Sequence, residues 1–128
     1  MADWADDTYQ DLSVRRVDEA VAVLTLDLPA RRNMMSDAMT ASWGRAVAAI
    51  AADPGVRAVV VTGTPPAFCS GGDLSWIGAE SHLGVEGLRE RMARFYRVWM
   101  AVGELRVPTV AAVNGAAIGA GLALAMAC

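Results

Sequence analysis

Apolar and polar residues alternate near the start of the chain, which predicts a pair of strands. Residues 12–17 and 21–28 are rich in valine and leucine, and the polar pair Asp18-Glu19 separates them. Two such runs with a short polar connection are typical of a β-hairpin. We expect the buried face of the second strand to be supplied by Val21, Val23 and Leu24.

Two later segments have apolar residues at helical spacing. In residues 37–52, directly after the capping residue Ser36, they are Met39, Trp43, Val47 and Ile50. In residues 85–105 they are Leu88, Met92, Phe95, Trp99 and Val102. Spacings of three and four residues place each set on one face of a helix, so both segments are predicted to be amphipathic helices.

Apolar β-branched runs predict two further strands, at residues 58–61 and 109–113. The first suits a strand covered on both faces in a parallel sheet. Residues 63–84, which lie between the first run and the second helix, are expected to form a loop. After the turn Asn114-Gly115, a helix of glycine, alanine and leucine is expected to run to Cys128. The resulting order of strands and helices predicts an α/β fold.

Composition narrows the possible functions. Hydrophobic residues make up 55% of the 128 residues and charged residues 20%, which indicates a folded domain. The net charge of −3 argues against a nucleic-acid partner. All eleven basic residues are arginine, which excludes Schiff-base and P-loop lysines. One histidine and two cysteines cannot build a zinc site or a histidine-based triad. The first residues contain no apolar signal segment, so a cytoplasmic location is expected.

The loop from Pro66 to Leu74 is the first candidate site. It follows a predicted buried strand, where open α/β sheets place their ligands. The adjacent glycines Gly71 and Gly72 would let the backbone approach a ligand, with the Gly72 N–H directed at a substrate oxygen. An ordinary turn has the same composition, so the loop alone does not decide between the two interpretations.

The second candidate site is the segment from Val113 to Gly121, in which a strand leads through small residues into a helix. The free amides at a helix N-terminus would donate to an oxyanion or a phosphate. The glycine pattern also resembles the nucleotide loop of short-chain dehydrogenases, although no acidic residue follows at the required distance. The 22 uncharged residues from Val107 to Cys128 could cross a membrane, but a buried strand followed by a helix explains them better, and no membrane span is predicted.

The loop Arg31-Arg32-Asn33 is the third candidate site. Its two guanidinium groups could bind phosphates through charge-assisted hydrogen bonds. A pair of arginines on a solvated surface is the alternative interpretation.

Taken together, the three sites resemble the enoyl-CoA hydratase/isomerase, or crotonase, family in order and spacing. The resemblance rests on residues 29–36 (PARRNMMS), 67–74 (AFCSGGDL) and 108–115 (PTVAAVNG) continuing to Gly121. It implies a spiral of ββα units, with residues 1–128 forming the N-terminal part of a single acyl-CoA-binding domain. Because the family is about twice this length, we expect the C-terminal half of the fold to be absent from the chain.

The resemblance also implies roles for individual residues. The backbone N–H groups of Gly72 and Ala120 would form the oxyanion hole for the thioester oxygen of an acyl-CoA. The remaining substrate-binding residues would be Arg31, Arg32, Ser70, Asp73, Leu74 and Trp76. No separate cofactor and no metal are implied, because coenzyme A is part of the substrate. Family members assemble as trimers or pairs of trimers, so a homotrimer or hexamer is expected.

One position departs from the family pattern. Hydratases of the family use two glutamates, and Ala123 occupies the position of the first, while the second would fall beyond Cys128. Hydration therefore lacks its acid/base pair in these residues, whereas isomerases of the family work with a single carboxylate from the second half. The sequence predicts an enzyme of enoyl-CoA hydration or double-bond isomerisation. The alternative is a non-catalytic module for acyl-CoA binding or assembly.

Overall fold

A four-stranded mixed sheet and four α-helices make up the computed structural model, which describes residues 3–5 and 7–128, except for the side chain of Ile77. The strands are β1 (Leu12–Val17), β2 (Val21–Leu26), β3 (Ala58–Gly63) and β4 (Thr109–Ala111). The helices are α1 (Asp37–Ala51), α2 (Ser75–Ala79), α3 (Gly84–Met100) and α4 (Ala120–Ala127). The sheet order is β1-β2-β3-β4; β1 and β2 are antiparallel, and the other neighbours are parallel. The predicted α/β class and N-terminal hairpin are confirmed.

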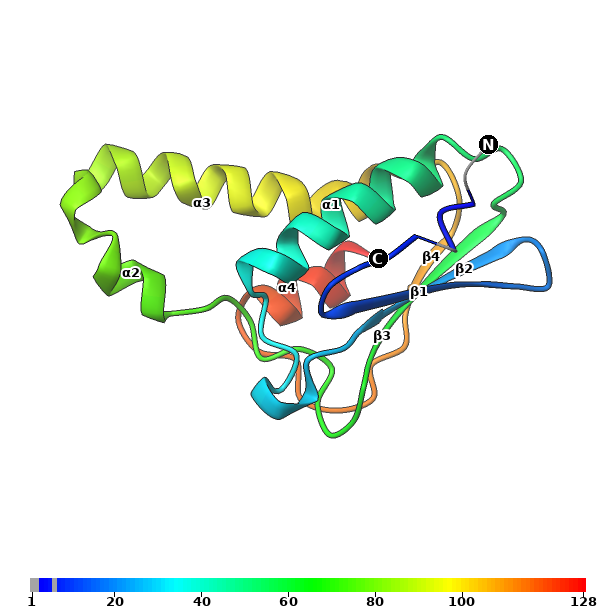
Figure 1. The fold of residues 1–128 in the computed structure, drawn as a ribbon, viewed down its shortest axis with the longest axis horizontal. Helices are drawn as coiled ribbons and strands as arrows, with labels where there is room; N and C mark the ends of the chain where they lie inside the picture. Colours follow the sequence, from blue (N-terminus) through cyan, green and yellow to red (C-terminus); the bar gives the residue numbers. More distant parts are fainter. Residues whose placement is uncertain (1–2, 6) are drawn as a thin grey trace.

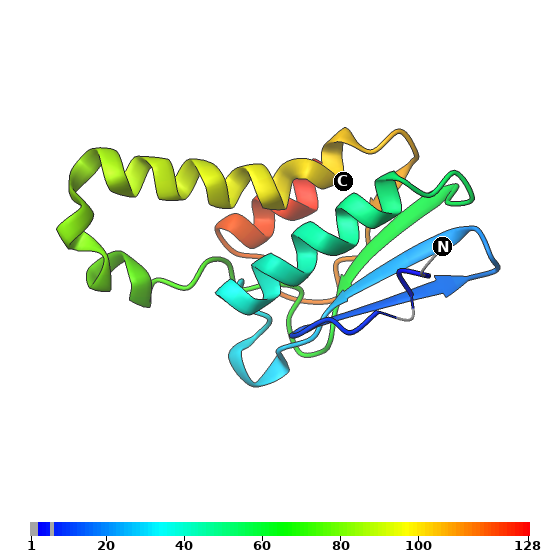
Figure 2. The ribbon, with the colours of Figure 1, turned by 45° about the horizontal axis from the view of Figure 1, so that its top comes forward.

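The helices gather on one side of the sheet, and the sheet residues that face them form the core (Figures 1 and 2). The alternate residues with no exposed surface on the two central strands are Ala22, Leu24, Leu26, Val59 and Val61. Of the three residues predicted to be buried on the second strand, Val23 and Leu24 are buried and Val21 is only half-buried. Val23 and Leu24 do not share one face, because successive strand residues point to opposite faces. The predicted burial of residues 58–61 on both faces is wrong, since alternate residues of β3 are only half-buried.

Helix α1 follows its sequence prediction closely. The Oγ atom of Ser36 accepts a hydrogen bond from the N–H of Met39 at 3.0 Å and caps the helix. All four predicted core residues of this helix, Met39, Trp43, Val47 and Ile50, are buried. The ring of Trp43 stacks on that of Trp99 in α3 with centroids 4.8 Å apart, which joins the two helices.

Helix α3 ends earlier than predicted and extends beyond the sheet. Its α-helical part ends at Met100, and a 3-10 turn, Ala101–Glu104, continues it. The predicted face is buried at Phe95, Trp99 and Val102. It is only half-buried at Leu88 and Met92, because the first half of α3 and the short helix α2 protrude from the body of the molecule (Figure 1).

The second half of the predicted loop 63–84 contains helical structure that the sequence analysis missed. Helix α2 occupies Ser75–Ala79, and the 3-10 turn Ser81–Leu83 joins it to α3. The 3-10 turn packs on both α2 and α3, at the protruding end of the molecule (Figure 2).

The last strand and helix are shorter than predicted. Strand β4 ends at Ala111, and α4 begins only at Ala120. The intervening backbone pairs with the loop after β3: the N–H groups of Phe68 and Cys69 donate to Ala116 O at 3.1 Å, and the N–H of Ile118 donates to Cys69 O at 3.0 Å. A helix cannot begin at Asn114-Gly115 because these backbone groups are already committed to another segment.

The N-terminal residues are tied to the body through Asp53, which follows α1. Its Oδ2 accepts hydrogen bonds from Trp4 Nε1 at 2.8 Å and from Arg16 Nη2 at 2.6 Å. These donors, together with the N–H of Gly55, lower the pKa of the Asp53 carboxyl to about 2. The ionised carboxylate therefore holds the start of the chain against the turn that leads into β3.

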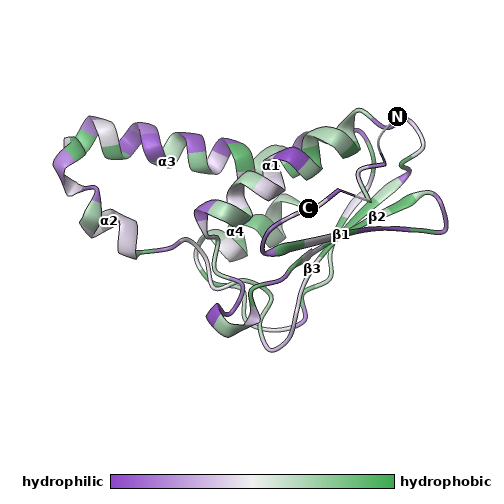
Figure 3. Cartoon of the chain, in the orientation of Figure 1, coloured by the Kyte–Doolittle hydropathy of each residue, from purple (hydrophilic) through white to green (hydrophobic). Residues whose placement is uncertain are grey.

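The exposed apolar surface lies mainly along the last strand and helix, where Figure 3 shows α4 in pale to green colours. The large apolar side chains exposed in this part are Val110, Val113, Ile118, Leu122 and Met126. In residues 3–5 and 7–128, no helix has both the length and the apolar character that a membrane span requires.

Candidate functional site

The three segments singled out in the sequence meet at the carboxyl ends of β3 and β4. The loop after β3 pairs with the segment after β4 through the parallel bridge between Cys69 and Ala117. The same loop pairs with the segment before α1 through the parallel bridge between Met35 and Gly72. Ligand sites of open α/β sheets lie at this edge, where the connections leave parallel strands.

Asn33 joins two of these segments, the one after β2 and the loop after β3, although its sequence context indicated only a place in the basic loop. Its side chain is completely buried. The Oδ1 atom accepts the N–H of Leu28 at 3.0 Å, and Nδ2 donates to Thr64 O and Ala67 O, both at 2.9 Å. Its backbone lies in the left-handed region with a φ of 55°, which asparagine tolerates better than most residues. A buried amide with partners in separate segments fixes their spacing.

Gly71 brings the loop after β3 against the start of α4. Its φ of 97° is a conformation that favours glycine, and its carbonyl accepts the N–H of Met35 at 2.8 Å. A Cβ atom at this position would lie 2.7 Å from Ile118 O and 3.5 Å from the backbone nitrogen of Ala120. Only glycine allows this close approach at residue 71.

Two backbone N–H groups are left without acceptors where these segments meet. In the part of the chain that the structure describes, neither the N–H of Gly72 nor that of Ala120 donates a hydrogen bond. Ala120 is the first residue of α4, where the positive end of the helix dipole adds to the donor strength of the amide. Such amides can stabilise negative charge on an oxygen atom that comes within reach of either.

A groove of about 500 Å³ collects most of the predicted substrate-binding residues; Gly72 lines it, whereas Ala120 does not. The predicted residues that line it are Arg31, Arg32, Ser70, Gly72, Asp73 and Leu74. The side chain of Leu74 is 76% exposed, so this apolar surface is available to a ligand. The structure therefore places six of the eight predicted site residues around one open groove.

Ser70 fixes the backbone of the basic loop and leaves its side chains available. Its N–H donates to Arg32 O at 3.0 Å, and its Oγ donates to Arg31 O at 3.3 Å. Among the described residues, neither guanidinium group forms an ion pair with a carboxylate. Two unpaired arginines at the rim of a groove can bind an anionic ligand such as a phosphate.

Asp73 is ionised and has local partners of its own. Its Oδ1 accepts the hydroxyl of Ser75 at 2.6 Å and the N–H of Ser75 at 3.0 Å. These hydrogen bonds, with a smaller contribution from the positive charge of Arg31, lower the pKa of the Asp73 carboxyl. A carboxylate that stays deprotonated is a poor general acid at neutral pH, and its bonds to Ser75 give it a role in holding the loop.

Trp76 and Ala123 lie apart from this groove. Trp76 is half-buried on α2, with the guanidinium carbon of Arg91 4.4 Å from the centre of its ring. Ala123 lies one turn into α4 and donates its N–H to Gly119 O at 3.1 Å. The sequence analysis did not identify Phe95 as a site residue, yet its Cζ lies 3.7 Å from the point where a Cβ on Gly72 would be. Its helical spacing indicated only a core position.

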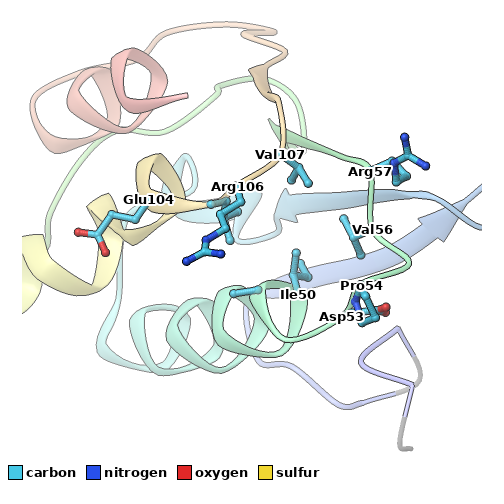
Figure 4. Close-up of a pocket in the computed structure, with 10 residues that line it drawn as sticks. Ile50, Asp53, Pro54, Val56, Arg57, Glu104, Arg106 and Val107 are labelled. Atoms are coloured by element: carbon cyan, nitrogen blue, oxygen red, sulfur yellow. The ribbon is translucent and has the colours of Figure 1, made fainter.

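A second pocket, of about 440 Å³, lies at the opposite edge of the sheet, before the first residues of β3 and β4 (Figure 4). Its charged residues include Arg57, Glu104 and Arg106, whose side chains point in different directions and do not converge on one point (Figure 4). No group of three or more histidine, cysteine, aspartate or glutamate side chains within residues 3–5 and 7–128 could hold a metal ion. Converging polar groups are found at the carboxyl edge of the sheet.

The arrangement at the carboxyl edge suits an elongated ligand with two polar regions. The N–H groups of Gly72 and Ala120 can receive an oxygen that gains negative charge, while Arg31 and Arg32 can receive an anionic end. The exposed Leu74 offers apolar contact at the rim of the groove. This combination can stabilise negative charge on a ligand oxygen and bind an anionic group of the ligand.

Comparison with known proteins shows which family the chain resembles. The family model described as "Enoyl-CoA hydratase/isomerase" matches residues 16–128. A protein of Mycobacterium tuberculosis H37Rv, described as "Probable enoyl-CoA hydratase EchA14", is 50% identical over 112 residues, which are 87% of this chain and 42% of that protein. A crystal structure of an enoyl-CoA hydratase/isomerase from Xanthobacter autotrophicus Py2 has a TM-score of 0.85 and 33% identity, covering 94% of this chain and 45% of that one. A crystal structure of an enoyl-CoA hydratase from Mycobacterium smegmatis has a TM-score of 0.84 and 37% identity, covering 93% of this chain and 46% of that one. The chain thus spans less than half the length of these relatives.

Proposed function

The chain belongs to the enoyl-CoA hydratase/isomerase, or crotonase, family, and from this we propose that its groove binds the coenzyme A thioester of a fatty acyl group. The thioester oxygen would lie between the N–H groups of Gly72 and Ala120. The observation that supports this proposal most directly is that both amides lack an acceptor among the described residues although their segments are packed together. Buried or half-buried donors are seldom left without a partner unless a ligand supplies it.

The chemistry of a thioester explains why two such donors would matter. Removal of a proton from the carbon beside the thioester, or addition of water to the far carbon of a conjugated double bond, places negative charge on the thioester oxygen, in an enolate that a proton later neutralises. Donors already directed at that oxygen stabilise the charge in the transition state, and each contributes roughly 3 kcal/mol. The proposed reaction is hydration of an enoyl-CoA or migration of its double bond, as part of fatty-acid metabolism.

Both proposed reactions need a carboxylate that takes up or gives the proton, and α4 contains none. Ala123 has no titratable group, and the Asp73 carboxylate is already bound to Ser75. Isomerisation with a single carboxylate is therefore the simpler proposal of the two. Ala123 also favours a second candidate function, in which the chain binds an acyl-CoA or takes part in an assembly without turnover.

The basic loop would receive the carrier end of the same ligand. Arg31 and Arg32 would bind the coenzyme A phosphates, while Ser70, Asp73 and Leu74 would contact the nucleotide and pantetheine parts along the groove. Trp76 would border the acyl pocket from α2. Coenzyme A would arrive as part of the substrate, so no separate cofactor is proposed. The family relationship further supports a homotrimer or hexamer and a cytoplasmic location as proposals.

Gly72 allows a matched test of the oxyanion hole. Gly72→Ala keeps the N–H, and its new Cβ would meet Phe95 Cζ at an ordinary contact distance of 3.7 Å. Gly72→Pro removes the N–H. We expect turnover of an enoyl-CoA, followed by the absorbance of the conjugated thioester, to survive in Gly72→Ala and to fall about a hundredfold in Gly72→Pro.

The same experiment separates the two candidate functions. Equal activity in the two variants would exclude the Gly72 N–H as a donor. A wild-type chain that binds an acyl-CoA in calorimetry but does not turn it over would favour the binding module. A wild-type chain that binds neither an acyl-CoA nor free coenzyme A would exclude both.

A further inference from the structure

Arg91 joins α3 to the start of α1 and to α2, which directly follows the groove residues 72–74. Its Nε pairs with Glu80 Oε2 at the end of α2, and its Nη2 pairs with Asp37 Oδ1 at the start of α1 at 3.2 Å. Its guanidinium carbon lies 4.4 Å from the centre of the Trp76 ring. The Arg91 side chain is only 21% exposed, in contrast to 78% for its neighbour Arg89. Three contacts and this burial indicate a fixed side chain rather than a solvated one.

Both ends of the segment from the glycine loop to α2 are connected to the start of α1. At the near end, the N–H of Met35 donates to Gly71 O at 2.8 Å and joins the segment before α1 to the glycine loop. From there the chain runs on through Gly72 to α2, which protrudes from the body (Figure 1). At the far end, Arg91 joins α2 back to α1. The segment from Gly72 to Glu80 is thus held at both of its ends.

The same face of α3 comes close to the glycine loop. Phe95 lies one helical turn after Arg91, and its Cζ would be 3.7 Å from a Cβ placed on Gly72. Arg91 therefore contacts one end of this segment, and Phe95 of the same helix lies near the other end. A shift of α2 relative to α3 would be transmitted to the loop that carries the Gly72 N–H.

We propose that Arg91 is a positioning residue, which fixes residues 72–80 and with them the direction of the Gly72 N–H and the place of Trp76. The role of Gly72 in this inference rests on the proposed function; the contacts of Arg91 do not. Stacking on Trp76 and pairing with Glu80 carry most of the effect, because both partners are half-buried. Asp37 is 85% exposed, so water weakens its pairing with Arg91.

Hydrogen exchange tests this role without requiring activity. Arg91→Met keeps the length and apolar stem of the side chain but removes its charge and its planar group. We expect amide exchange in residues 73–83 to rise about tenfold, with β1 to β3 unchanged. Arg89→Met is the matched control, because Arg89 pairs only with Glu86, at 3.5 Å, among the described residues, and it should leave exchange in residues 73–83 unchanged.

The proposal would be overturned if amide exchange in residues 73–83 did not rise in Arg91→Met. It would also be overturned if exchange rose evenly over the sheet, because that result shows a loss of global stability. Arg91→Lys should restore part of the protection, since lysine keeps the charge but not the planar stacking group. In calorimetry, Arg91→Met should bind an acyl-CoA about tenfold more weakly than Arg89→Met, with free coenzyme A as the reference ligand. Altered exchange in a chain that binds no acyl-CoA would leave Arg91 in its role and refute the proposed function. Unaltered exchange in Arg91→Met together with normal acyl-CoA binding would refute the role of Arg91 and leave the proposed function in place.

Discussion

At the scale of single residues, the spacing of the site depends on the side chain of Asn33. Its one oxygen and its one NH2 group have partners in the segment after β2 and in the loop after β3, at Leu28, Thr64, Ala67 and Phe68, between 2.9 and 3.2 Å away. All of these partners are backbone groups, which cannot find other acceptors or donors without moving the loops. Loss of the amide would leave several buried polar groups unpaired at once.

We therefore expect Asn33→Ala to lower the free energy of unfolding by about 3 kcal/mol, the cost of stranding buried donors and acceptors. Urea denaturation measures this change. Asn114→Ala is the comparison: Asn114 is exposed, and its amide makes longer hydrogen bonds, of 3.2 Å with Gly63 N and 3.3 Å with Ala67 O. Its loss should cost no more than about 1 kcal/mol. Equal losses in the two variants would contradict the role given to Asn33.

At the scale of elements, the sequence predicted those boundaries that local chemistry determines. The capping hydroxyl of Ser36 and the apolar spacing that follows it are local, and α1 begins where they indicate. The start of α4 is not local: Ala116 and Ile118 pair with the loop after β3, so the helix begins at Ala120. Helix α2 was missed because its five residues are too few to show a helical period.

The same distinction between local and distant contacts decides which features of the candidate site could be predicted from the sequence. Arg31, Arg32 and Ser70 could be predicted to meet, since connections that leave parallel strands share one edge of the sheet. The support of the site by Asn33 and Arg91 could not be predicted. Their partners lie in distant segments, and a lone asparagine or arginine carries no pattern of its own. Family resemblance supplied the residues of the groove, but not the contacts that hold them.

Two glycines in different helices give opposite expectations for the same substitution. A Cβ on Gly121 in α4 would lie against the Cys69 carbonyl and 2.8 Å from Cys69 Cβ, whereas a Cβ on Gly78 in α2 meets nothing within 4 Å. Gly121→Ala should destabilise the fold by roughly 1–3 kcal/mol through overpacking. Gly78→Ala should stabilise it by at most about 1 kcal/mol through helix propensity. Thermal unfolding of both variants measures the difference, and a stable Gly121→Ala protein would contradict the close contact between α4 and the glycine loop.

At the scale of the whole molecule, the two edges of the sheet carry similar charge but different geometry. Arg31 and Arg32 line the groove after the strands, together with Gly72. Arg57 and Arg106 line the pocket before the strands, where their side chains point apart (Figure 4). In residues 3–5 and 7–128 none of the four arginines pairs with a carboxylate. The difference between the edges therefore lies in what surrounds each pair of charges.

This difference allows a control in which the net charge changes equally. Arg31→Ala/Arg32→Ala and Arg57→Ala/Arg106→Ala each remove two positive charges from a chain whose net charge is −3. The first double variant should weaken acyl-CoA binding about ten- to a hundredfold in calorimetry, because charge-assisted contacts to phosphate are lost. It should also reduce the dependence of the affinity on salt, since fewer charges are then screened. The second should leave the affinity close to that of the wild type. Equal losses in both would mean that net charge alone attracts the ligand, and the carboxyl edge would no longer be distinguished as the binding site.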